Sequence, residues 1–268
     1  MTQRLLIIGC GNMGGAMLAG WLGAGEPPSR FAVLDPAMEA APDGVALYRD
    51  SADAASAGHD AVLLGFKPQQ LAALGPGLQD LTGAGVTVCS LLAGITLAQL
   101  AKAFPGAAAH IRVMPNLAAR IGKSPVILAQ NGLDDAARAE MRGFYDALGT
   151  AMWLEDEAQF DLVTALAGSG PGFVFRFIDA LASAAEELGL DRATADQLAC
   201  AMVEGASALA ANADALPGVL ADRVASPGGM TREGLNVLDN EDALVRLMVA
   251  TLRATRDRGL ALSQQGSD

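Results

Sequence analysis

A short segment in the last quarter of the chain has the composition of an anion-binding loop. Residues 226–231 read Ser-Pro-Gly-Gly-Met-Thr and stand just before apolar residues with helical spacing. Consecutive glycine N–H groups at the start of a helix can cradle a small carboxylate or phosphate. The segment therefore predicts a site for a small anion. The alternative is a glycine-rich loop that only caps the helix.

A second candidate site lies near the amino end. Residues 9–14 follow the pattern GxGxxG, between a predicted strand and a predicted helix. In this pattern the glycines permit the tight turn, the approach of a pyrophosphate and close helix–strand packing. Asp35 ends the next strand, where a carboxylate accepts a hydrogen bond from a ribose 2′-hydroxyl and repels a 2′-phosphate. We predict NADPH or NADH as cofactor, with Asp35 favouring NADH; the alternatives are a bare turn and, for Asp35, a strand-end turn residue.

Three further loops follow predicted strands and share the carboxyl edge of the predicted sheet. They are residues 67–68 (Lys-Pro), 90–94 and 114–116 (Met-Pro-Asn). Cofactors bind at this edge in parallel sheets, so each loop is a candidate cofactor contact. Each is equally well explained as a connecting loop.

The types of residue that are missing indicate which bond is reduced. After Tyr145 the chain contains no tyrosine, histidine or lysine. Reduction of a carbonyl normally needs such a group to deliver a proton to oxygen, whereas a protonated imine accepts hydride directly. If the second half of the chain forms the substrate site, this absence favours C=N over C=O reduction. His110 or Lys67 from the first half would weaken that inference.

A glycine-rich break interrupts the helical second half at residues 168–171, Gly-Ser-Gly-Pro. Two glycines and a proline are costly inside a helix. We expect the break to allow close approach to a ligand or a kink between helices, the alternative being a plain loop.

Alternating strands and helices position these motifs. Short apolar runs predict strands at residues 5–8, 31–34, 45–47, 61–64, 86–89 and 108–113, with helices at 12–24, 69–79 and 97–103. This order predicts an α/β fold, a Rossmann-like doubly wound parallel sheet. Possible edge strands at 126–129 and 151–154 flank a helix at 134–148. Helical periodicity then dominates, at 158–167, 173–188, 192–211 and from about 241 to 262. We therefore predict a dinucleotide-binding domain at 1–156 and a helical substrate and oligomerisation domain at 157–268.

Composition narrows the partners. The 268 residues are 51% hydrophobic and carry a net charge of −12, so burial is extensive and a nucleic-acid partner is not expected. Three cysteines without CxxC spacing and two histidines provide no zinc-ligand cluster, and they favour a reduced, cytoplasmic protein. The uncharged stretch after Arg4 imitates a signal peptide, but a strand, a glycine turn and a helix explain it. No later segment is long enough without charge to span a membrane.

Taken in order, the motifs resemble those of pyrroline-5-carboxylate reductases. The resemblance rests on the fingerprint, Lys67-Pro68-Gln69, the segment 112–116 (Arg-Val-Met-Pro-Asn), the Gly-Ser-Gly-Pro break and the segment 226–231. It covers nearly the whole chain. It implies reduction of 1-pyrroline-5-carboxylate to L-proline by NAD(P)H, the last step of proline biosynthesis. It also implies a Rossmann domain, a helical domain interleaved with a partner's, and homodimers that often form decamers.

The same resemblance implies roles for individual residues. The cofactor would be held by Gly9, Gly11, Asn12, Met13, Gly14 and Asp35, with Phe66, Lys67, Pro68, Ala93 and Gly94 beside its nicotinamide. The substrate would be held by Ser226, Gly228, Gly229, Met230 and Thr231, with Asp214 nearby. The N–H groups of residues 228–231 would bind its carboxylate, and the Thr231 hydroxyl, the one catalytic group, would contact the ring nitrogen. An anionic Asp214 would favour the iminium form. It could also be a loop aspartate.

Several positions depart from the family pattern. Leu117-Ala118 replace the usual Thr-Pro, Gly172 replaces alanine, and Met230 and Glu233 stand where smaller residues are common. Many relatives prefer NADPH and lack an acid at the position of Asp35. Rival functions are a non-catalytic dinucleotide-binding paralogue, an imine reductase for a larger ring and a 3-hydroxyacid-dehydrogenase-like enzyme. The last needs a lysine in its helical domain, whereas the lysines here end at Lys123.

Overall fold

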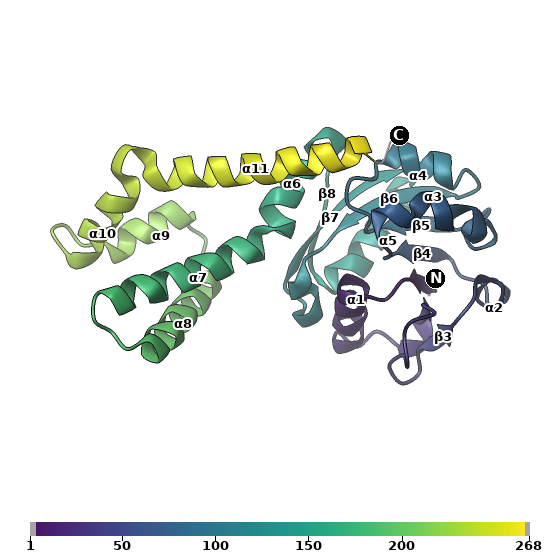
Figure 1. Cartoon of the computed structure of the whole chain (residues 1–268), viewed down its shortest axis with the longest axis horizontal. Helices are drawn as coiled ribbons and strands as arrows, with labels where there is room; N and C mark the ends of the chain where they lie inside the picture. Colours follow the sequence, from purple (N-terminus) through teal and green to yellow (C-terminus); the bar gives the residue numbers. More distant parts are fainter. Residues whose placement is uncertain (1–3, 266–268) are drawn as a thin grey trace. The chain divides into compact units, whose positions relative to one another are not determined.

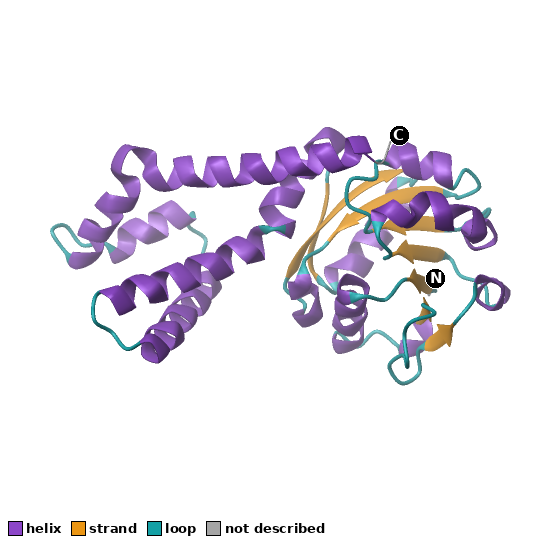
Figure 2. Ribbon diagram, in the orientation of Figure 1, coloured by secondary structure: helices purple, strands orange, loops and turns teal. Residues whose placement is uncertain are grey.

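The computed structural model describes residues 4–265 (Figure 1). Contacts divide the chain into two compact units. The first spans Met1–Gly168 and takes in the segment from Thr255 onward, and the second spans Ser169–Ala254. The first unit is a sheet covered by helices, and the second is helical throughout (Figure 2).

The first unit is built on an eight-stranded sheet with the order β3-β2-β1-β4-β5-β6-β7-β8. The strands are β1 (Leu5–Ile8), β2 (Phe31–Leu34), β3 (Ala46–Tyr48), β4 (Ala61–Leu64), β5 (Thr87–Ser90), β6 (Ala109–Met114), β7 (Ser124–Asn131) and β8 (Gly149–Trp153). Strands β1 to β6 pair in parallel, and the order reverses beside β1. The doubly wound Rossmann-like sheet is thus confirmed, with loops after β1, β2, β4 and β5 at one carboxyl edge.

Two strands, β7 and β8, run against the other six. β7 pairs antiparallel with β6, in register from Met114 opposite Ile127 to His110 opposite Asn131. The link between the two strands is only residues 115–123, which contain the short 3₁₀ helix Leu117–Ile121. A parallel connection needs a crossover of a dozen or more residues, so this link can only turn the chain back. The longer helix α5 (Asp135–Asp146) then allows β8 to run parallel to β7.

Helices bury both faces of the sheet, and alternate residues of each strand point to opposite faces. Leu5 and Ile7 pack in one cluster with side chains of α1 (Asn12–Gly23) and α5. Leu6 and Ile8 pack in another with side chains of α2 (Ser51–Ser56) and α4 (Leu97–Ala103). Because both faces are covered, β1 is apolar throughout, as expected of a central parallel strand.

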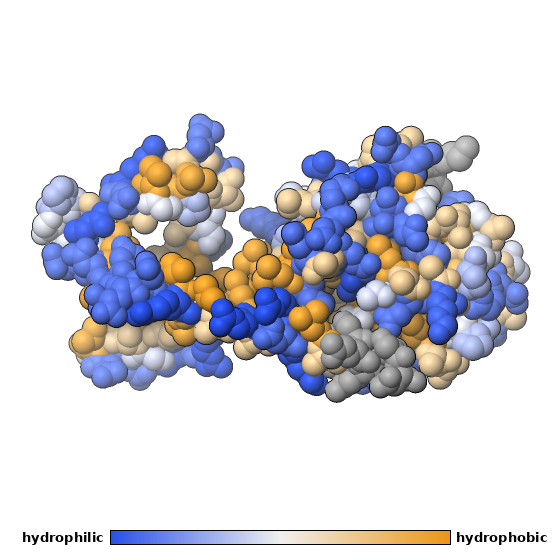
Figure 3. Space-filling model, turned by 90° about the horizontal axis from the view of Figure 1, so that it is seen from above, coloured by the Kyte–Doolittle hydropathy of each residue, from blue (hydrophilic) through white to orange (hydrophobic). Residues whose placement is uncertain are grey.

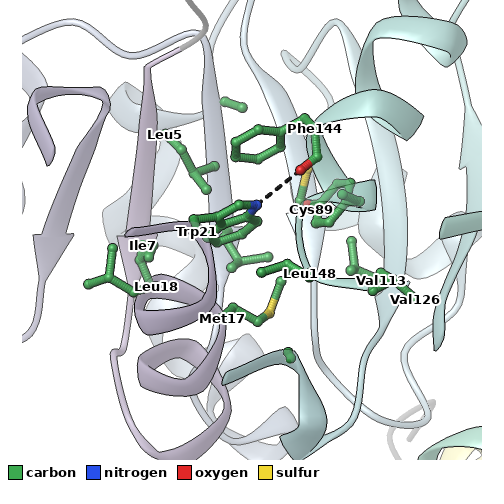
Figure 4. Packing of buried hydrophobic residues seen from close by; sticks show 14 of the residues in the cluster. Leu5, Ile7, Met17, Leu18, Trp21, Cys89, Val113, Val126, Phe144 and Leu148 are labelled. Carbon is green, nitrogen blue, oxygen red and sulfur yellow. Dashed lines mark hydrogen bonds between the residues drawn. The ribbon is translucent and has the colours of Figure 1, made fainter. Parts of the chain in front are cut away.

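Aromatic side chains fix α1 against α5 under the sheet. Trp21 is fully buried and stacks on Phe144 with ring centroids 4.7 Å apart (Figure 4). Its indole Nε1–H donates to the Phe144 carbonyl at 3.1 Å, so the one polar atom of the ring is satisfied. Burial raises the pKa of the neighbouring Cys89 thiol to about 12, and this cysteine is therefore a neutral core residue.

The second unit leaves much apolar surface uncovered. Its helices are α7 (Gly170–Glu187), α8 (Arg192–Ala211), α9 (Pro217–Val224), α10 (Met230–Asp239) and part of α11 (Ala243–Gln265). α7 and α8 pack through a small cluster of alanines, Ala182, Ala195 and Ala199. Large apolar side chains remain exposed, and Figure 3 shows apolar surface on this unit in orange. Exposed apolar surface of this kind marks an interaction site.

Several predicted elements differ from the structure. The helix expected at 69–79 is a 3₁₀ turn, the short helix α3 (Leu71–Leu74) and a second 3₁₀ segment, because Gly75-Pro76-Gly77 interrupts it. α2 and α9 were not predicted. The last helix, predicted from about residue 241, is α11 and begins at Ala243. Glu241 and Asp242, with φ of 49° and 56°, separate it from α10.

Candidate functional site

The glycine fingerprint forms a tight turn between β1 and α1. Gly9 has a φ of +85°, a conformation that favours glycine, and its N–H donates to the Leu34 carbonyl at 2.9 Å. A Cβ at Gly14 would lie 3.1 Å from the Gly9 carbonyl, so helix and turn pack closely there. A Cβ at Gly11 would meet nothing within 4 Å, which leaves that backbone open to a ligand. The turn fits a dinucleotide pyrophosphate.

Gly65, which follows β4, supports this turn from the next strand. Its N–H donates to the Ile8 carbonyl at 2.8 Å, and a Cβ on it would overlap the Gly9 carbonyl oxygen. The backbones of residues 9 and 65 therefore touch directly. Gly65 was not predicted as a site residue. A glycine immediately after a buried strand at the cofactor edge was the signal that could have identified it.

The Asp35 carboxylate joins the fingerprint to the loop after β2. Its Oδ2 accepts a hydrogen bond from the Cys10 N–H at 3.0 Å, and its Oδ1 accepts one from the Ala37 N–H at 2.9 Å. Burial, with a smaller contribution from the Asp35 charge, raises the pKa of the Cys10 thiol to about 11. Cys10 is therefore neutral at physiological pH and adds no negative charge beside a bound pyrophosphate.

The loops after β4 and β5 reach the same edge as the fingerprint. Lys67 begins a short 3₁₀ turn with Pro68, and its N–H donates to the Gln70 side chain at 3.0 Å. Gly94 has a φ of +78°, so the turn that includes Ala93 depends on a glycine. Phe66 precedes Lys67 and packs partly buried against the sheet. The structure brings these residues of the first unit to the carboxyl edge of the sheet, where we propose that they contact the cofactor.

Asn116, two residues after β6, uses its side-chain amide for hydrogen bonds within the protein. The side chain is buried, its Nδ2 donates to the Ala167 carbonyl at 2.9 Å, and its Oδ1 accepts from the Ala118 N–H. Ala167 belongs to a π-helical turn, Thr164–Gly168, that ends α6 (Phe160–Val163). Gly168 lies against the end of the Met114 side chain, so the turn packs on β6. The predicted break at 168–171 is thus anchored on the Met-Pro-Asn loop.

A partly buried ion pair holds the same region. The Arg112 guanidinium pairs with Glu157 at 2.8 Å and lies 3.8 Å from the centroid of the Phe160 ring. Glu157 also accepts the N–H of Leu97 at the start of α4 at 2.8 Å. Arg112 therefore connects the sheet with the segment that leads into the helical region. No spacing pattern along the chain indicates this pairing.

The segment Ser226–Thr231 is a turn followed by a helix start. The Gly229 N–H donates to the Ser226 carbonyl at 2.9 Å, and Gly228 between them has a φ of +71°. Proline followed by glycine of positive φ is the signature of a type II turn. This bond occupies the Gly229 N–H, one of the four amides of 228–231 that were predicted to serve an anion. A Cβ on Gly229 would overlap the Ser226 hydroxyl, so the turn is compact.

The first turn of α10 offers the remaining donors. Gly229 is the N-cap and carries no side chain, and no side-chain cap is formed within the described part of the chain. The first N–H groups of a helix have no partner inside it, so those of residues 230–232 are available to an anion. Met230 is 94% exposed and Thr231 is exposed beside it. Asp214, in the link between α8 and α9, is exposed too.

The arginine in the first turn of α10 is already paired. Arg232 binds the Asp222 carboxylate on α9 at 2.7 Å. An anion at the start of α10 would therefore be held by N–H groups and the helix dipole. Among residues 4–265 there is no group of three histidine, cysteine or acidic side chains that could hold a metal ion. None of the helices in that range is both long and apolar enough to cross a bilayer.

Two family models match the chain. Residues 157–262 match pyrroline-5-carboxylate reductase dimerisation, and residues 4–94 match NADP oxidoreductase coenzyme F420-dependent. The first match covers the helical region with its exposed apolar side chains. The second covers the fingerprint, Asp35 and the loops after β4 and β5.

Known proteins resemble the chain over nearly its full length. A pyrroline-5-carboxylate reductase of Pseudomonas aeruginosa is 32% identical, with 98% of each chain covered. One from Methanosarcina acetivorans is 32% identical over 95% of this chain and 96% of its own. The solved structure of a pyrroline-5-carboxylate reductase from Coxiella burnetii is 30% identical, has a TM-score of 0.91, and covers 98% of this chain and 99% of its own.

Proposed function

The chain belongs to the pyrroline-5-carboxylate reductase family, and we propose that it carries out the reaction of that family with the residues described above. The enzyme reduces 1-pyrroline-5-carboxylate to L-proline with NAD(P)H, in proline biosynthesis. The glycine turn at residues 9–14 supports this function most directly, because it fits a dinucleotide and lies in the region matched as an NADP oxidoreductase.

In this proposal the cofactor binds at the carboxyl edge of the sheet. Gly9, Gly11, Asn12, Met13 and Gly14 hold the pyrophosphate, Asp35 holds the adenosine ribose, and the nicotinamide lies beside the residues Phe66, Lys67, Pro68, Ala93 and Gly94. When bound, NAD(P)H supplies the hydride. The turns at Gly9 and Gly94 support these assignments, since both depend on glycine at positive φ.

The substrate carboxylate is assigned to the start of α10. The Ser226–Gly229 turn exposes the first-turn amides, with Gly228 and Met230 at its rim, and these amides hold the carboxylate. The Thr231 hydroxyl orients the ring nitrogen, and Asp214 favours its protonated form. The carbon of a protonated imine accepts hydride without a separate acid, so rate enhancement comes from positioning and electrostatics. The lack of His, Lys and Tyr after Tyr145 is consistent with this chemistry.

The enzyme is an oligomer of identical chains, since its helical region matches a family dimerisation domain and exposes large apolar side chains. We propose that homodimers form first and can assemble into decamers. We also place the enzyme in the cytoplasm, which three sparse cysteines support.

Turnover tests the function directly. Purified full-length enzyme with 1-pyrroline-5-carboxylate should oxidise NADH or NADPH and form one proline for each cofactor oxidised. The measurement is absorbance at the reduced nicotinamide band together with proline quantification. An oligomeric, folded preparation that binds cofactor yet turns over with neither NADH nor NADPH would refute the proposal in favour of a non-catalytic relative.

A further inference from the structure

We infer that Arg49 is a positioning residue for Asp35, and that the two together make the adenosine-ribose subsite select NADH over NADPH. The inference rests on the proposed function, because it concerns the cofactor of the same enzyme. It depends on contacts within the first unit only. No part of it requires the substrate site.

Two backbone N–H groups hold the Asp35 carboxylate in place. Its two oxygens accept hydrogen bonds from two different loops, the Cys10 N–H of the fingerprint and the Ala37 N–H after β2. The carboxylate is thereby fixed in position between them. A fixed acceptor loses little freedom when a ribose hydroxyl donates to it, which favours NADH.

Arg49 holds the loop that follows Asp35, residues 36–39. Arg49 follows β3 and spans that loop with both ends of its guanidinium. Nη1 donates to the Pro36 carbonyl and Nη2 donates to the Glu39 carbonyl, each at 3.0 Å. β3 itself pairs with β2, and the Asp35 N–H donates to the Tyr48 carbonyl at 3.2 Å. Arg49 thus ties residues 36–39 to the end of β3, where the Tyr48 carbonyl accepts the Asp35 N–H.

The segment around Asp35 carries only negative charge before Arg49. Between Phe31 and Tyr48 the charged residues are Asp35, Glu39 and Asp43, all acidic. A 2′-phosphate would bring further negative charge to this loop. Arg49 is the first cation that follows, and its guanidinium donates to two carbonyl groups. A planar fork suits this paired geometry, whereas the single ammonium of lysine does not.

The experiment compares Arg49→Ala and Arg49→Lys with the unchanged enzyme. We expect both variants to raise KM for NADH roughly tenfold. This corresponds to the loss of about one charge-assisted hydrogen bond, the one between the ribose hydroxyl and the Asp35 carboxylate. The value of kcat should change less than about twofold. KM for NADPH should change less than about twofold. Arg138→Lys is the matched control, since Arg138 on α5 pairs with Glu155. It should leave both KM values unchanged.

Two results would overturn the inference. If Arg49→Ala raises KM for NADPH alone and Arg49→Lys restores it, Arg49 is a phosphate ligand. If KM for NADH is unchanged in both variants, Arg49 has no positioning role. A double-mutant cycle with Asp35→Ser sharpens the test, because Arg49→Ala should add little to the NADH effect of Asp35→Ser. Fully additive effects would contradict action through Asp35.

Failure of this inference can be told apart from failure of the proposed function. Direct binding of NADH and NADPH, followed by nicotinamide fluorescence, needs no turnover. If the enzyme does not reduce 1-pyrroline-5-carboxylate, the binding ratios of the same variants still decide the role of Arg49. If turnover is normal but the ratios do not shift, only the role of Arg49 is refuted.

Discussion

Replacing Thr231 with alanine is expected to lower kcat/KM for 1-pyrroline-5-carboxylate by roughly a hundredfold, the typical cost of removing one preorganised donor. The proposed role of the hydroxyl is to orient the ring nitrogen while hydride reaches the adjacent carbon. The proposed cofactor site lies in the first unit, at residues 9–14 and the neighbouring loops. The dissociation constant for NADH should therefore remain nearly unchanged, as measured by fluorescence titration.

Three variants control for local damage to the helix start. Thr231→Ser keeps a hydroxyl and should retain most of the activity, whereas Thr231→Val keeps the shape and should behave like the alanine variant. Met230→Ala changes the neighbouring side chain, which is almost fully exposed, and leaves the first-turn amides in place. An equal loss of activity and cofactor affinity in Thr231→Ala would instead assign the residue a structural role.

A charge on the exposed apolar stripe of α8 is expected to separate the subunits. Leu198, Met202 and Leu209 share one side of this helix and are 57%, 51% and 74% exposed. In a symmetric dimer, Met202→Glu would bury two carboxylates. At about 3 kcal/mol each, the dimer dissociation constant should rise by about four orders of magnitude. Sedimentation at micromolar concentration should then show monomer, with activity lost in parallel.

Gln197→Glu is the matched control, since it adds the same charge to α8 at an exposed position next to the stripe. It should remain oligomeric and active. Because Met202 is exposed in the single chain, Met202→Glu should leave the circular dichroism spectrum of the folded chain unchanged. A Met202→Glu enzyme that remains dimeric would place the interface on another face of the helical unit.

Local patterns predicted the strands of the sheet better than its connections. β1, β2 and β4 have the predicted bounds because each is a short apolar run buried on both faces. The direction of β7 did not follow from its own residues, because the nine-residue link after β6 determines it. The helix expected at 69–79 was wrong in detail, since glycine and proline at its centre outweigh the apolar spacing.

The candidate site shows the same division. Glycines that need positive φ or close packing could be found from the fingerprint alone, and Gly9 is one of them. Which donors stay available could not, because the Gly229 N–H is taken by a turn carbonyl. Contacts between distant segments, such as Asn116 with Ala167 and Arg49 with residues 36–39, depend on tertiary packing and leave no trace in spacing.

The ratio of kcat/KM for 1-pyrroline-5-carboxylate to that for 1-pyrroline, which lacks the carboxylate, tests the central claim most directly. If the first-turn amides of α10 hold the carboxylate, two charge-assisted hydrogen bonds are lost with 1-pyrroline. The ratio should then be on the order of a thousand, at roughly 2 kcal/mol for each bond. Cofactor affinity should be the same in both assays. A ratio near one would show that the carboxylate is not held there and would contradict the assignment of Ser226–Thr231 as the substrate site.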